Sequence, residues 1–153
     1  MKRWLSSAAA GTVAWFAGIA IFFGPAQLLL TSPHLQSAKM IGAFSEPPLP
    51  RIVEAPWIFP LGLFLVNLCV AAAYRLVRSS LNGSVWARGR KCGLLVWLVA
   101  IPWFEFYLPF NVLREPLPLV FLELACWFLT LQLVGHAVAW AGGRGEFTSV
   151  ASA

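Results

Sequence analysis

The sequence predicts an all-α membrane protein built as a bundle of four transmembrane helices. Hydrophobic residues make up 59% of the 153 residues and charged residues only 11%, whereas a soluble domain carries about a quarter charged residues. Four apolar stretches are long enough for a bilayer core, which needs about 20 helical residues; they lie at 4–30, 57–74, 92–113 and 117–141. These stretches are continuously apolar and lack the alternation that is typical of a membrane β-barrel.

The first stretch is expected to remain in the protein as a helix. Lys2 and Arg3 precede it, as in a signal peptide, but the apolar run continues as far as Leu28–Leu30, whereas the apolar core of a signal is only about 7–15 residues long. Small residues follow one face of this helix and let another helix approach closely. Packing within the chain is favoured over a dimer interface. The stripe consists of Ser7, Gly11, Ala14 and Gly18.

The connections between the stretches differ in length. Residues 31–56 form a long loop, in which the Ser32–Pro33 pair is typical of a helix start, and a short helix lying in the membrane interface is expected there. Residues 114–116 form a connection so short that the third and fourth helices are predicted to make an antiparallel hairpin. Residues 1–141 therefore form one transmembrane domain, and 142–153 are expected to be a flexible tail.

The distribution of lysine and arginine predicts the orientation in the membrane. With the N-terminus in the cytoplasm, one side holds eight basic residues: Lys2, Arg3, Arg75, Arg78, Arg88, Arg90, Lys91 and Arg144. The other side holds three: Lys39, Arg51 and Arg114. Basic residues are enriched in the cytoplasmic loops of membrane proteins. Both termini are therefore predicted to be cytoplasmic, with 31–56 outside.

Two glutamates lie inside the predicted hairpin. Glu105 is nine residues before Arg114 and Glu123 is seven after Pro116, so at 1.5 Å per residue both lie roughly 10–14 Å from the turn. A charged side chain facing lipid there costs about 2.5–3.5 kcal/mol, so both are expected to face the bundle interior or a wet cavity. Their predicted polar layer comprises Glu105, Glu123, Asn67, Tyr107, Asn111 and Gln27.

Three interpretations of this layer stay open. Glu105 and Glu123 are protonated structural groups that hydrogen-bond to Asn67 or to backbone freed by prolines, or they form a proton, ion or ligand site. The third interpretation is that they lie at an interface with another subunit. The change Glu105→Gln separates the first two, because an amide replaces a protonated acid without effect but cannot carry a proton.

No enzyme chemistry is indicated by the remaining residues. The six acidic residues are all glutamate, which excludes chemistry that uses aspartate. Cys69, Cys92 and Cys126 form no paired motif, and buried cysteines behave as small apolar groups. His34 and His136 are expected on opposite sides of the bilayer, so they do not form one haem site. No catalytic residue, metal site or cofactor is predicted.

The stretches "LQSAK", "PPLPR", "PWFEFYLPFNVLREP" and "LELACWFLTLQLVG" resemble those of a group of small, uncharacterised bacterial inner-membrane proteins. The resemblance covers most of the chain between about residues 25 and 140. It implies a location in the bacterial inner membrane and a four-helix body, and it brings no assigned activity.

The sequence favours a non-enzymatic accessory or structural subunit of a larger membrane assembly. A small transporter or proton-coupled binding protein that uses Glu105 and Glu123 is the alternative, but no internal repeat of the kind that many transporters contain is found. A membrane enzyme is the third reading. The expected partners are the lipid bilayer and other membrane subunits or a second copy. The net charge of +5 lies beside apolar spans and does not indicate nucleic acid.

Overall fold

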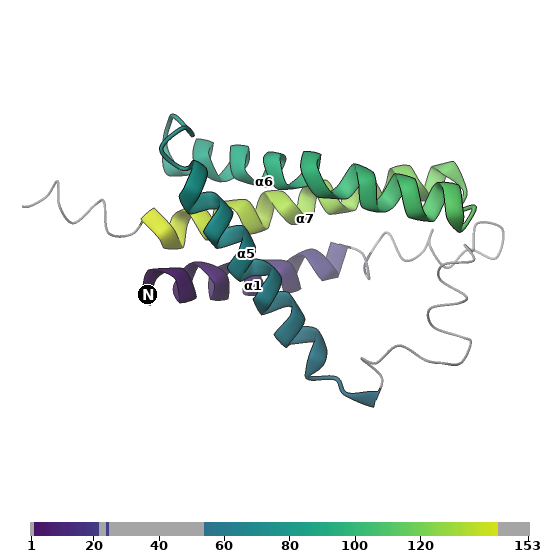
Figure 1. The fold of residues 1–153 in the computed structure, drawn as a ribbon, viewed down its shortest axis with the longest axis horizontal. Coiled ribbons are helices and arrows are strands. Elements are labelled where there is room, and N and C mark those ends of the chain that lie inside the picture. The colour runs from purple at the N-terminus through teal and green to yellow at the C-terminus, as the bar shows by residue number, and fades with distance from the viewer. Residues whose placement is uncertain (1, 22–23, 25–53, 144–153) are drawn as a thin grey trace, which may run out of the picture.

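The structure is a computed structural model, and it describes residues 2–21, 24 and 54–143 of the chain. Four long helical spans of the described residues are apolar enough to cross a membrane, which confirms the prediction of an all-helical, multi-pass membrane protein. In Figure 1 they pack as a bundle. The elements are α1 (Lys2–Ile21), α5 (Ile58–Val77), α6 (Val85–Ile101), its continuation η2 (Pro102–Val112) and α7 (Leu117–Gly143).

The third span begins earlier than predicted and changes its winding within the membrane. Ser84 caps α6, since its side-chain oxygen accepts a hydrogen bond from the Ala87 N–H at 3.3 Å. The span therefore starts at Val85, seven residues before the expected position 92. At Pro102 the chain passes into a π-helix, which is wider than an α-helix and often occurs at functional sites. The segment also contains Pro109, which lacks a donor for regular helix bonds.

A tight turn returns the chain from η2 into α7. Arg114 adopts a left-handed backbone conformation with φ of 55°, which reverses the chain direction within a few residues. The Glu115 N–H then donates to the Pro109 carbonyl oxygen at 2.9 Å. Figure 1 shows α6 and η2 running alongside α7 in the opposite direction, so the predicted antiparallel hairpin is present.

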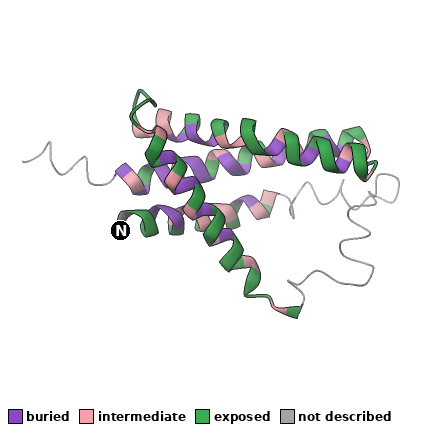
Figure 2. Cartoon of the chain, in the orientation of Figure 1, coloured by how far each residue is buried: buried purple, intermediate pink, exposed green. Residues whose placement is uncertain are grey.

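Helix α7 lies at the centre of the bundle. It packs against α6 on one side and α1 on the other, while α5 crosses over α1 and diverges from the bundle toward its own N-terminal end (Figure 1). Of the α7 span 39% is buried, compared with 22–28% of each other span, and Figure 2 shows this difference as the buried stripe along α7. The main core cluster is Val70, Ala71, Tyr74, Cys92, Val134, Val138 and Ala139.

Helices α6 and α7 approach closely at three glycines, here called the glycine contact: Gly89, Gly93 and Gly135. A Cβ atom added to Gly135 would lie 2.5 Å from the Gly89 carbonyl oxygen and 2.6 Å from the Gly93 nitrogen. Backbone therefore touches backbone here, as small residues allow in membrane helix pairs. The four-residue spacing of Gly89 and Gly93 places both on the α6 face toward α7.

The small-residue stripe of α1 lies against other helices of the same chain. A Cβ atom on Gly11 would lie 2.5 Å from the Asn67 side-chain oxygen of α5 and 3.0 Å from Val138 of α7. Gly18 faces the side chain of Thr130 on α7. Ser7 is buried, and Ala14 packs against the main core cluster. This arrangement is packing within the chain.

The structure describes part of the remaining predicted organisation. Helix α7 continues through Gly142 and Gly143, which were expected to begin the tail, and Gly143 is buried. Residues 25–30 of the first predicted span, the expected interfacial helix in 31–56 and residues 144–153 of the tail lie outside the described residues, apart from Glu54–Pro56.

Candidate functional site

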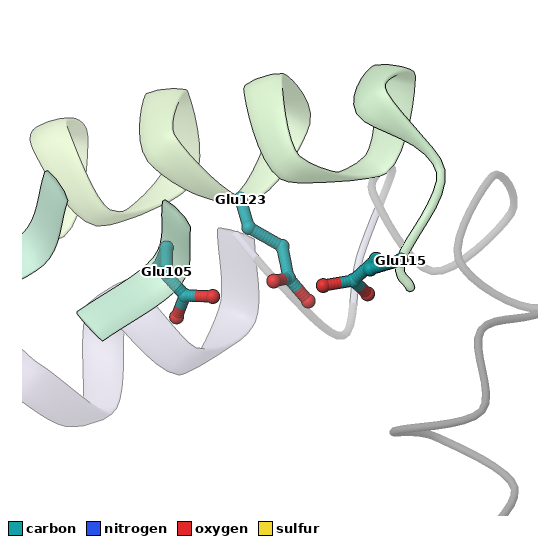
Figure 3. Close-up of side chains that lie close together, drawn as sticks. All are labelled: Glu105, Glu115 and Glu123. Atoms are coloured by element: carbon teal, nitrogen blue, oxygen red, sulfur yellow. The ribbon is translucent and has the colours of Figure 1, made fainter. Parts of the chain in front are cut away.

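Three glutamates meet at the end of the bundle where η2 turns into α7, and they are here called the glutamate cluster. Glu105 comes from η2, Glu115 from the turn and Glu123 from α7 (Figure 3). One carboxylate oxygen of each lies within 4.8 Å of those of the other two. The three residues are only 2%, 1% and 4% exposed. The structure thus brings Glu105 and Glu123 together and adds a third acid.

Each helical glutamate lies on a face that is otherwise apolar. On α7 the buried residues Leu119, Val120, Glu123 and Cys126 recur at spacings of three and four, so Glu123 lies on the stripe facing the bundle. On η2, Glu105 and Pro109 are the two buried positions, while the aromatic residues between them are exposed. The helical pattern therefore directs both carboxylates inward.

Glu115 joins the cluster through the backbone of the turn. Its N–H is held by Pro109, and its side chain points toward that of Glu123 in Figure 3. Sequence reasoning treated Glu115 only as part of a short connection. Glu115 lies directly before Pro116, in a turn between two helices with buried faces, and this position could have suggested that its side chain is buried. Residues in turns are more often exposed, however, so the sequence did not predict it.

Trp127 holds Glu105 in place. Its indole Nε1–H donates to Oε1 of Glu105 at 2.5 Å. Trp127 lies one turn after Glu123 on α7, and its ring packs at 44° against Trp15 of α1 with centroids 5.3 Å apart. Three helical elements therefore fix the orientation of the Glu105 carboxylate.

The cluster has the chemistry of a hard-cation or proton site. All three side chains offer oxygen, which Ca²⁺, Mg²⁺ and Mn²⁺ prefer. Two oxygens that bind one Ca²⁺ at about 2.4 Å can be at most about 4.8 Å apart, and no pair of these oxygens exceeds that distance. Closely spaced carboxylates also favour a shared proton. No metal site was predicted from the sequence, because Glu115 was not placed with the other two glutamates.

Asn67 does not lie in the glutamate cluster. It is fully buried beside Gly11 and Val138, and its amide Nδ2 donates to the Leu63 carbonyl oxygen at 2.8 Å. Val138 is 15 residues beyond Glu123 on α7, which corresponds to about 22 Å along the helix. The expectation of equal depth assumed parallel helices, whereas α5 crosses the bundle at an angle (Figure 1).

The other members of the expected polar layer are also placed elsewhere. Tyr107 is 50% exposed and its ring stacks on that of Trp103, with centroids 4.3 Å apart and an angle of 7°. Asn111 is exposed, and its Nδ2 donates to the Phe106 carbonyl oxygen at 3.4 Å. Gln27 lies outside the described residues. Of the five predicted residues that the structure describes, it brings only Glu105 and Glu123 together.

The group of side chains that could hold an ion includes neither a cysteine nor the described histidine. All three cysteines are free thiols. His136 lies near the other end of α7, with its Nδ1 2.6 Å from the Gln132 carbonyl oxygen.

Comparisons of the chain with protein-family models, with curated proteins and with solved structures found no match.

Proposed function

We propose that this multi-pass membrane protein holds a proton or a hard metal cation at the glutamate cluster, in the role of a small transporter or proton-coupled binding protein. The observation that carries the proposal is the meeting of three buried carboxylates within 4.8 Å. Ionisable residues inside membrane spans are costly, and those that face the bundle interior commonly mark ion paths or proton relays. Glu105 and Glu123 belong to two neighbouring spans.

The change Glu123→Gln tests this proposal on the purified, full-length protein. The wild type is expected to show either the infrared carbonyl band of a protonated carboxyl group or binding of one Mn²⁺, followed by electron paramagnetic resonance. Glu123→Gln removes one carboxylate and is expected to abolish that band, or to weaken Mn²⁺ binding about tenfold or more. Mn²⁺ is the probe because it prefers oxygen ligands.

Glu54→Gln is the matched control, because Glu54 is exposed, precedes α5 by four residues and lies outside the cluster. It makes the same chemical change and is expected to leave both signals intact. The proposal is wrong if the wild type shows neither signal, or if Glu54→Gln and Glu123→Gln have equal effects.

The second candidate is an accessory or structural subunit of a larger membrane assembly. The N-terminal half of α5 diverges from the bundle (Figure 1) and exposes Leu61, Leu65 and Val66, each about half accessible. Such a face packs against lipid or against a neighbouring helix. For this candidate we expect stable co-purification with other membrane subunits in mild detergent and no cation flux in reconstituted vesicles. A lone protein with flux that Glu123→Gln abolishes favours the first candidate.

We further propose that both termini are cytoplasmic, in the inner membrane of a bacterium, in line with the family that the sequence resembles. Basic residues support this orientation: Arg75 lies in the last turn of α5, Arg78 directly follows that helix, and Arg88, Arg90 and Lys91 lie in the first turns of α6. These segments lie at the same end of the bundle as the start of α1 and the end of α7 (Figure 1). The positive-inside rule assigns that end to the cytoplasm.

Reporter fusions test the orientation. A fluorescent protein fused to the C-terminus is expected to fluoresce, and an alkaline phosphatase fused there is expected to be inactive, because the phosphatase matures only outside the cytoplasm. A phosphatase fusion after residue 45, in the expected outer loop, serves as the positive control. High phosphatase activity at the C-terminus contradicts the proposed topology.

A further inference from the structure

A small polar cavity opens at the arginine-rich end of the bundle, opposite to the glutamate cluster. Its volume is about 70 Å³, and three helices contribute to its wall. It is here called the arginine cavity. Its lining residues are Ser7 of α1, Tyr74, Arg75 and Arg78 of α5, and Gly142 of α7.

Two buried polar side chains form part of the wall of the arginine cavity. Ser7 and Tyr74 are only 4% and 2% exposed, and both carry hydroxyl groups. A Cβ atom on Gly142 would lie 3.3 Å from Oγ of Ser7 and 3.4 Å from Cε1 of Tyr74, so a side chain at this position would extend into the polar space. The missing side chain of Gly142 therefore keeps the cavity open.

Two arginines give the cavity a positive charge. Arg75 and Arg78 are three residues apart on α5, so their side chains share one face of the helix. The Arg75 guanidinium lies 5.0 Å from the centroid of the Trp4 ring, a cation–π contact that holds it toward α1.

This combination of groups suits a phosphate. Guanidinium groups bind phosphate oxygens through paired, charge-assisted hydrogen bonds, and hydroxyl groups add further donors. At about 70 Å³ the cavity has room for about two water molecules or a group of similar size. Basic pockets between helices at the edge of a membrane face the lipid headgroups.

We infer that the arginine cavity binds the headgroup phosphate of an anionic phospholipid. The site is distinct from the glutamate cluster and does not depend on the proposed cation or proton. Trp4 at its edge has an indole ring, which is typical of the level of the headgroups. The bound lipid would join α1, α5 and α7 at the end where α5 crosses the bundle.

Lipid titration of the full-length protein in mild detergent, followed by native mass spectrometry, tests this inference. The wild type is expected to retain one phosphatidylglycerol per chain. Arg75→Gln and Arg78→Gln are each expected to weaken this binding about tenfold, since a charge-assisted hydrogen bond is lost. Ser7→Ala is expected to weaken it about threefold, as for a neutral hydrogen bond.

Arg90→Gln is the matched control, because Arg90 lies at the same end, on α6, but does not line this cavity. It is expected to change the affinity less than twofold. Equal losses in Arg90→Gln and Arg78→Gln would show general attraction of lipid to basic residues and overturn the inference. A second measurement adds inorganic phosphate to the lipid-bound protein. Displacement of the lipid by millimolar phosphate would indicate a site for free phosphate and would overturn the assignment to a lipid. Arg78→Lys keeps the positive charge but cannot form the paired hydrogen bonds of a guanidinium group, so it is expected to bind the lipid more weakly than the wild type. Its thermal midpoint is expected to equal that of the wild type, which verifies that the variant is folded.

Discussion

Replacing Gly135 by leucine is expected to separate α6 from α7 and to lower the free energy of unfolding by about 3 kcal/mol or more. Overpacking of a tight core costs about 1–3 kcal/mol when neighbouring side chains can move. At the glycine contact the neighbours are backbone atoms, the Gly89 oxygen at 2.5 Å and the Gly93 nitrogen at 2.6 Å from the added Cβ. Neither can move without displacing a whole helix, so the cost lies at or above the upper end of this range.

Gly62→Leu is the matched control for this prediction. Gly62 also lies inside a helix, α5, but a Cβ atom there meets nothing within 4 Å. Both substitutions therefore change helix propensity alike, and only Gly135→Leu creates a clash. Denaturant unfolding of the protein in mild detergent measures the difference in the free energy of unfolding between the two variants. The unfolding is monitored by tryptophan fluorescence or by helical circular dichroism. Equal stability of the two variants would contradict the close backbone approach of α6 and α7.

Replacing Glu105 by leucine is expected to destabilise the protein by about 1–3 kcal/mol, the range for leaving a buried hydrogen-bond donor without its acceptor. The Trp127 indole N–H donates to the Glu105 carboxylate at 2.5 Å, and leucine offers no acceptor in its place. Glu105→Gln retains an oxygen of similar reach, so it is expected to cost about 1 kcal/mol or less. Comparison of Glu105→Leu with Glu105→Gln thus separates the effect of the hydrogen bond from that of the carboxyl group.

A double-mutant cycle with Trp127→Phe measures this contact directly. If the hydrogen bond carries the stability, Glu105→Leu is expected to cost much less in the Trp127→Phe background than in the wild type. Trp97→Phe serves as the control background, because the Trp97 indole donates to the Leu124 backbone oxygen at 3.0 Å and not to the cluster. Additive effects of Glu105→Leu and Trp127→Phe would show that the two side chains are not coupled.

The two ends of the bundle present opposite chemistry. At one end the glutamate cluster concentrates carboxylates inside the helix pair, and at the other the arginine cavity gathers two guanidinium groups near Trp4. Since the two regions are separated by most of α7 (Figure 1), Glu123→Gln and Arg78→Gln are expected to act independently. The infrared and Mn²⁺ measurements on Glu123→Gln and the lipid-binding measurements on Arg78→Gln therefore report on separate sites.

The sequence by itself determined the class of the protein and the positions of its spans. Continuous apolar stretches of bilayer length identify membrane helices because lipid leaves no other partner for backbone N–H and C=O groups. A three-residue connection then requires an antiparallel hairpin, and burial of a glutamate in a span requires it to face inward. For these reasons Glu105 and Glu123 were identifiable as neighbours before their geometry was known.

Only the tertiary structure decided which polar groups share a site. Asn67 lies outside the predicted polar layer because α5 crosses the bundle at an angle. The tilt of a helix is set by side-chain packing against its neighbours, which the local sequence does not encode. Glu115 entered the glutamate cluster because the left-handed Arg114 and the Pro109 carbonyl direct the turn inward. The glycine contact likewise depends on Gly135 meeting Gly89 and Gly93, which are more than 40 residues away in the chain. Contacts of this kind arise from the relative rotation and crossing of helices, whereas the sequence pattern specifies only which face of each helix is small, polar or apolar.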